Sequence, residues 1–125
     1  MENAIAAEFG IGRVIPGAKH FSLTLEIGAS GQVSGTGRII QTTYPPLNLS
    51  TTLSGSFEAL SSGADTRQVI TLTGLEASTG LVNVQATLTI DSKDGETGVA
   101  SYKYLNHPGE WVKELREPVS VKWLK

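Results

Sequence analysis

The C-terminal part of the chain carries the side chains best suited to holding a ligand. Tyrosine, tryptophan and lysine are interleaved there at Tyr102, Lys103, Tyr104, Trp111 and Lys113. An aromatic ring with a polar tip offers an apolar face and a hydrogen-bonding group together, and a neighbouring ammonium group adds donors. We therefore predict that these five residues bind a small or saccharide-like ligand. The alternative is that the aromatic rings pack the protein core.

Residues for nucleophilic catalysis are scarce. A serine nucleophile needs a base within hydrogen-bond reach. The sequence has no G-x-S-x-G motif and only two histidines, His20 and His107, which flank expected strands or turns. We predict no catalytic residues.

One acidic cluster could supply hard oxygen ligands to a metal ion: Asp91, Asp94 and Glu96 surround Gly95. The full spacing of a calcium loop is missing, and Asp-Gly is a strong signal for a two-residue hairpin turn. There is no cysteine to bind zinc or form disulfides. We predict neither a metal site nor a cofactor.

The overall charge disfavours a polyanionic partner. A net charge of −2 at pH 7 without a basic run argues against nucleic acid. No apolar stretch approaches the length of a transmembrane helix, and the first ten residues lack the pattern of a signal peptide. We expect a cytoplasmic protein, with export without a signal peptide as the alternative.

The chain reads as short strands separated by polar turns. Strict alternation of apolar and polar residues over 21–27 and 81–91 is typical of half-buried strands. In the second stretch Val82 and Val84 are expected to face the core and Asn83 to face away. We predict one β domain over 1–125, in which 1–9 is a loose arm or an edge strand.

Glycines occupy inward positions of several expected strands: 35, 37, 55 and 74. A strand without a side chain at a bend lets a sheet coil tightly and close. We therefore predict an all-β fold, a small antiparallel barrel of about eight strands. The alternative is a two-sheet β-sandwich.

Two turns set the expected pairing of the last three strands. Asp94-Gly95 fits a type I′ turn, and Pro108-Gly109 fits the centre of a type II turn. These turns predict three cross-strand pairs: Ile90 with Val99, Leu105 with Val112, and Lys103 with Glu114.

The two registers disagree about which face Tyr102 and Tyr104 occupy. The first turn places Lys103 inward, whereas the bulk of the tyrosines favours the core for them. A one-residue bulge near Gly98 would reconcile the two registers.

Several short motifs, taken in order, resemble a known family. They are Pro16-Gly17-Ala18, FSLTLEI, GQVSGTGRI, Pro45-Pro46-Leu47, LSGSF and GVASYKYL. The chain resembles an uncharacterised bacterial family of all-β proteins of about this length, a domain of unknown function. The resemblance implies a bacterial source and a single β domain, and it implies no activity.

Three functions remain open. The leading hypothesis is a non-catalytic binding or interaction module for a small molecule, a glycan or a protein partner. The second is a structural subunit of a homo-oligomer or of an exported, toxin-like assembly, in which an outward threonine face would make subunit contacts. The third and least favoured is a small-barrel enzyme.

Overall fold

The structure is a computed structural model, and it describes residues 5–43, 46–62, 65–91, 95–106 and 109–124. These ranges form eight strands: β1 (Ile5–Ile11), β2 (His20–Ile27), β3 (Gln32–Gln41), β4 (Leu47–Ser62), β5 (Asp65–Leu75), β6 (Val82–Asp91), β7 (Thr97–Leu105) and β8 (Trp111–Leu124). In this part of the chain, no helix is long and apolar enough to cross a membrane. Residues 5–9, expected as an arm or an edge strand, belong to β1.

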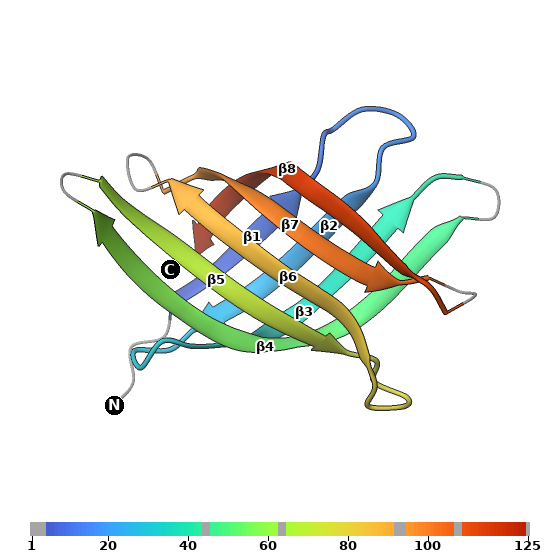
Figure 1. Cartoon of the computed structure of the whole chain (residues 1–125), viewed down its shortest axis with the longest axis horizontal. Helices are drawn as coiled ribbons and strands as arrows, with labels where there is room; N and C mark the ends of the chain where they lie inside the picture. The colour runs from blue at the N-terminus through green and yellow to red at the C-terminus, as the bar shows by residue number, and fades with distance from the viewer. Residues whose placement is uncertain (1–4, 44–45, 63–64, 92–94, 107–108, 125) are drawn as a thin grey trace.

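The eight strands form a closed antiparallel barrel (Figure 1). Each strand pairs with the next one in the chain, and β1 also pairs with β8, from Ala6 opposite Leu124 to Ile11 opposite Val119. The predicted barrel is confirmed, and the two-sheet sandwich is excluded.

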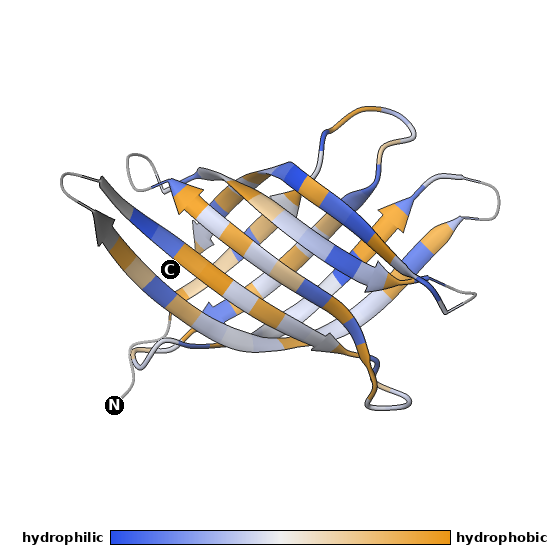
Figure 2. Ribbon diagram, viewed as in Figure 1, coloured by the Kyte–Doolittle hydropathy of each residue, from blue (hydrophilic) through white to orange (hydrophobic). Residues whose placement is uncertain are grey.

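The core fills the barrel interior because side chains alternate between the two faces of each strand. Along β2, for example, Phe21, Leu23, Leu25 and Ile27 are buried. Figure 2 shows the alternation as apolar and polar bands along the ribbon. Inward side chains from all eight strands meet in one apolar cluster.

Close strand approach requires glycine at the tightest bends of the sheet. A Cβ atom at Gly55 would collide with the carbonyl oxygen of Thr71 on β5, and one at Gly35 would collide with that of Thr24 on β2. Both obstacles are backbone atoms, which cannot rotate away. The expected role of the inward glycines is therefore confirmed.

The predicted hairpin registers are wrong by one residue. Ile90 lies opposite Gly98, and Leu105 lies opposite Trp111. Lys103 accordingly faces Lys113, and the expected pair of Lys103 with Glu114 does not form. The strand pairing beside each turn therefore differs from the pairing that the sequence motif of the turn predicted.

The bulge lies in a different place from the one expected. Between β6 and β7 the register is continuous through Gly98, whereas the β7–β8 register shifts between Ala100 and Tyr102. β8 has one residue more than β7 at this shift. Arg116 lies there and has a φ of 56°, the only non-glycine positive φ in the described chain. The tyrosines nevertheless face the core, as their bulk predicted.

Candidate functional site

A shallow groove of about 540 Å³ crosses the outer surface of β5, β6, β7 and β8. In Figure 1, β5, β6 and β7 are on the side of the barrel that faces the viewer. Outward positions supply its polar lining: Thr71, Thr73, Gln85, Thr87, Ser101, Lys103 and Lys113. Leu115 adds an apolar side chain that is 67% exposed. The outward threonine face of the sequence analysis is thus one wall of this groove.

Two lysines stand directly opposite one another in the groove. Lys103 on β7 pairs with Lys113 on β8, and the described lining contains no acidic side chain. Lys103 Nζ also lies 4.9 Å from the ring centroid of Trp111, a cation–π contact at the groove's end. The groove therefore concentrates positive charge beside an exposed aromatic ring.

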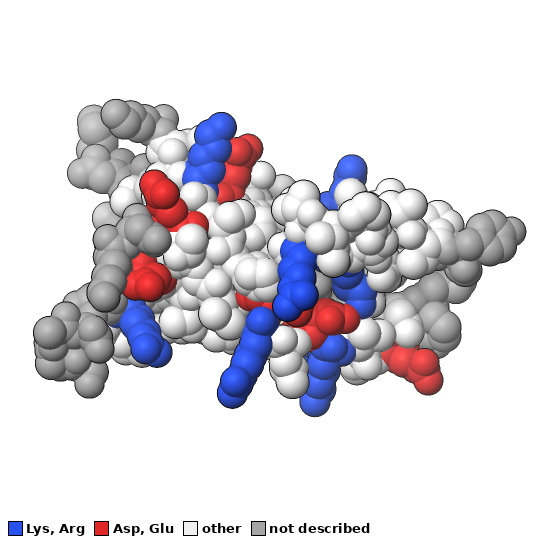
Figure 3. Space-filling view, turned by 90° about the horizontal axis from the view of Figure 1, so that it is seen from above, with Lys and Arg blue, Asp and Glu red and all other residues white. Residues whose placement is uncertain are grey.

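On one face of the molecule (Figure 3), positive charge is not segregated from negative charge. Figure 3 shows basic and acidic side chains interspersed on the face seen from above. The lysine pair is therefore a local feature that the β7–β8 register creates.

The five predicted ligand residues do not form one site. Lys103, Lys113 and Trp111 are on the outer surface, whereas Tyr102 and Tyr104 are inside the barrel, 3% and 4% exposed. Tyr102 packs against Phe21, with ring centroids 5.0 Å apart. The two tyrosines therefore act as core residues, and the strand alternation explains the division.

A polar cluster that sequence patterns did not reveal lies beside the tyrosines. Lys19, from the connection between β1 and β2, forms an ion pair of 2.6 Å with Glu114 on β8. Its Nζ also lies 4.6 Å from the centre of the Tyr104 ring. β1 pairs with β8 only from Val119 onward, so Lys19 reaches the part of β8 that β1 leaves uncovered.

The cluster keeps its groups in their ordinary charge states at neutral pH. Burial alone would lower the pKa of Lys19, but contacts with Glu114 and Tyr104 outweigh burial and raise the pKa. Burial, then the charges of Glu114 and Glu117, raises the pKa of the Tyr102 phenol. Both shifts favour the charged lysine and the protonated phenol at neutral pH.

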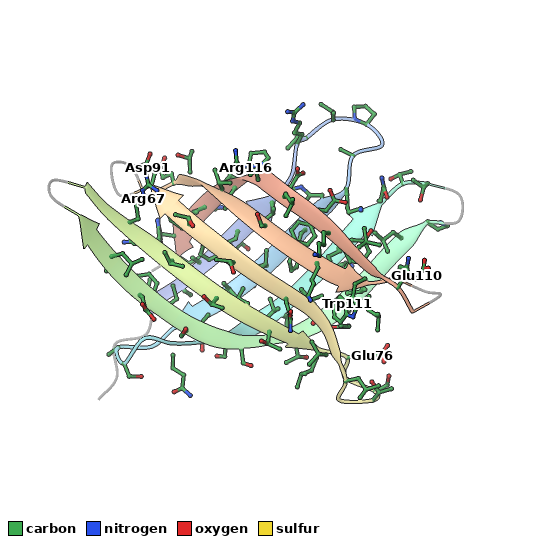
Figure 4. The ribbon with its side chains drawn as sticks, viewed as in Figure 1. Arg67, Glu76, Asp91, Glu110, Trp111 and Arg116 are labelled. Carbon is green, nitrogen blue, oxygen red and sulfur yellow. The ribbon has the colours of Figure 1, made fainter. Side chains whose placement is uncertain are left out.

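A second hollow, of about 560 Å³, opens at one end of the barrel. Figure 4 shows Glu76 and Trp111 at this end, and Arg67 and Asp91 at the other. Asn83 lines the hollow and is buried, contrary to the outward position predicted for it. The β5–β6 register shifts beside it, and alternation over 81–91 gave no sign of that shift.

The remaining candidates of the sequence analysis are the two histidines and the acidic residues around Gly95, of which the structure describes only some. His20 shares a hollow on the outer surface with Ser120; both are described, and no hydrogen bond joins them. His107 and Asp94 are outside the described residues. Among those described, no three histidine, cysteine or acidic side chains are grouped to hold a metal ion.

Comparison with known proteins identifies a family and no activity. Comparison with curated proteins gives no match. The family described as Domain of unknown function (DUF1842) matches residues 4–111, most of the chain. The motifs that suggested such a family lie almost entirely within this match. The chain therefore belongs to this family of domains of unknown function.

Proposed function

We propose that the protein is a non-catalytic binding module that takes an anionic, saccharide-like ligand in the groove on β5–β8. The observation that carries the proposal is the pairing of Lys103 with Lys113 beside the exposed ring of Trp111.

The lysine pair supports an anionic ligand. Like charges directly opposite one another destabilise a sheet. A carboxylate or sulfate between the two ammonium groups would remove this repulsion and accept hydrogen bonds from both. The ligand-free groove thus has an unfavourable interaction that anion binding relieves.

The remaining lining supports a saccharide. Hydroxyl groups of Thr71, Thr87 and Ser101 and the amide of Gln85 lie in the same groove. Such groups both donate and accept, which matches the hydroxyl groups of a sugar. Trp111 does not itself line the groove, but it contacts the lining residue Lys103, is 42% exposed and offers an aromatic ring to a sugar.

The test is a titration of the ¹⁵N-labelled protein with a uronate hexasaccharide, followed by NMR. We expect shifts at groove residues, weaker binding at higher salt, and no binding of a neutral maltohexaose. Lys103→Gln or Lys113→Gln should each weaken binding about threefold or more, since each removes one charged contact.

Lys122→Gln is the matched control, because Lys122 is an exposed lysine on the same strand that does not line the groove. It should leave the affinity unchanged. Equal binding of the neutral and the anionic hexasaccharide, or equal loss in the control variant, would overturn the proposal.

A further inference from the structure

We infer that the open end of the barrel is a separate site for a small, uncharged and mostly apolar molecule that carries one carbonyl or hydroxyl group. The hollow of about 560 Å³ lies there, between β4, β6 and β7. Small-molecule sites have volumes of about 300–1,000 Å³ and are found in the mouths of β-barrels. The inference does not depend on the proposed groove function.

The walls of this hollow combine a group of aliphatic side chains with polar ones at Asn48, Ser50, Glu76, Asn83 and Asn106. Leu47 and Leu49 occupy inward positions of β4 and are only partly buried against the core. Val82 on β6 and Leu105 on β7 belong to the same aliphatic group, and Leu81 is 65% exposed. Burying these side chains against an apolar ligand would be favourable, because it removes apolar surface from water.

Asn83 is the one polar side chain of this lining that is buried among the described residues. Asn83 is 6% exposed, its Oδ1 accepts from the Thr51 hydroxyl at 2.7 Å, and its Nδ2 donates to the Ser50 carbonyl at 3.2 Å. An asparagine amide has two donor and two acceptor positions. Among the described residues two of the four are used, so a donor and an acceptor remain for a ligand.

Two local irregularities place this amide. The β5–β6 register passes from Gly74 opposite Val84 to Leu75 opposite Val82, so Asn83 is the extra residue of a bulge. Bulges redirect side chains and are common next to functional sites. A Cβ atom at Gly74 would collide with the Thr51 hydroxyl, so glycine is needed to admit the polar pair.

The polar pair is unfavourable for packing alone. A buried polar group lowers stability unless it is hydrogen-bonded, and an apolar pair of the same shape would need neither partner. The chain thus uses a bulge and a glycine to hold a buried amide beside the aliphatic side chains of the hollow. A few placed polar groups in an apolar pocket are typical of ligand sites.

The charge at this end disfavours an anionic ligand. Glu76 is the one charged side chain in the described lining, and its carboxylate accepts a hydrogen bond from Thr79. No lysine or arginine is present in that lining. An anion is therefore disfavoured here, in contrast to the outer groove.

The first test is fluorescence titration of the full chain with the neutral probe N-phenyl-1-naphthylamine. Val82→Trp fills the hollow and should weaken binding at least about tenfold, because the ligand loses its apolar contacts. Val99→Trp is the matched control, since Val99 is an outward residue of β7 that is 48% exposed. Equal affinities of the two variants would overturn the inference.

The second test asks whether Asn83 recognises the ligand's polar group. The native protein should bind 1-acetylnaphthalene about fivefold more tightly than 1-ethylnaphthalene, the effect of one net hydrogen bond. In the Thr51→Val/Asn83→Leu variant, which replaces both members of the buried side-chain pair with apolar residues, this preference should disappear. A preference that survives in this variant would exclude Asn83 as the ligand's partner.

The proposed function of the groove and the inference about the hollow can be overturned independently of each other. Lys103→Gln and Lys113→Gln should leave binding of the neutral probe unchanged, and Val82→Trp should leave binding of the uronate hexasaccharide unchanged. Loss of probe binding in the lysine variants would instead place the probe in the outer groove and overturn the inference.

Discussion

Lys19 and Glu114 are 95 residues apart in the chain, yet their charged atoms meet at 2.6 Å. They join the connection between β1 and β2 to β8, where β1 provides no partner for that strand. Their side chains are 13% and 28% exposed, so water screens the pair only in part. The ion pair therefore links β8 to the β1–β2 connection at a position where β1 forms no backbone pairing with β8.

Breaking this ion pair should lower stability. Lys19→Met keeps the apolar stem and should lower the free energy of unfolding by about 1–3 kcal/mol, between the values for exposed and buried pairs. Urea unfolding measures it, and a double-mutant cycle with Glu114→Gln gives the coupling energy. Lys122→Met, which removes an exposed lysine opposite Glu8, is the control. A coupling energy near zero would show that the pair contributes nothing.

Stability should fall as the pH rises above about 10. The folded-state pKa of Tyr102 is raised above its ordinary 10.0, and that of Lys19 above 10.5, so above these values the folded chain binds more protons than the unfolded one. The stabilisation is complete below the unfolded-state values and is lost as pH rises through the folded-state ones. Urea midpoints between pH 9 and about 11.5 should show a shallower decline for Tyr102→Phe. Identical slopes for the variant and the native chain would refute the assignment to Tyr102.

The approach of β4 to β5 predicts that Gly55 cannot be replaced. Gly55→Ala should destabilise the protein by about 3 kcal/mol or more, because the new methyl group meets the backbone carbonyl of Thr71. Gly28→Ala is the control: its Cβ would lie 3.5 Å from the nearest atom, an ordinary contact, and should change stability by about 0.5 kcal/mol at most. Thermal unfolding followed by circular dichroism distinguishes the two. Similar melting temperatures would contradict the close approach.

The lysine pair predicts opposite effects on stability and on binding. Lys113→Glu places a carboxylate opposite Lys103 and should raise the free energy of unfolding by about 0.5–1 kcal/mol, while binding of the uronate hexasaccharide is lost. Lys122→Glu, which faces Glu8, should instead lower stability. Both variants change the net charge equally, so the sign of the change isolates the cross-strand pair. A loss of stability in Lys113→Glu would show that the two lysines do not repel.

The barrel could be predicted because its determinants are repeated along the chain. Alternation recurs in segment after segment, and inward glycines such as Gly35 and Gly55 mark the bends. Each repeat supports the same conclusion, so an error in one strand does not change the fold. The family resemblance rested on motifs spread in the same way.

The registers could not be predicted because each depends on one local irregularity. A slip of one residue moves every side chain to the other face, and the turn motifs did not define the strand register to within one residue. Arg116 has no feature that announces a positive φ, and Asn83 follows the apolar-polar alternation that its bulge interrupts. The bulk of Tyr102 and Tyr104 was the better guide to the core, because large rings favour burial whatever the turn.

The candidate sites were predicted only in part for the same reason. Lys103, Lys113 and Trp111 share one surface as expected, but the tyrosines do not. Lys19 and Glu114 gave no sequence signal, because no local pattern reports a contact between two loops or strands so far apart.

The pairing of β1 with β8 has a consequence for the newborn protein. β1 is translated before β8, so until β8 has been made the growing sheet has two open edges. Open edges are where other chains add and aggregates begin. A ribosome-bound chain lacking 119–124 would therefore expose the backbone of β1, and this protein closes its barrel only after β8 has been translated.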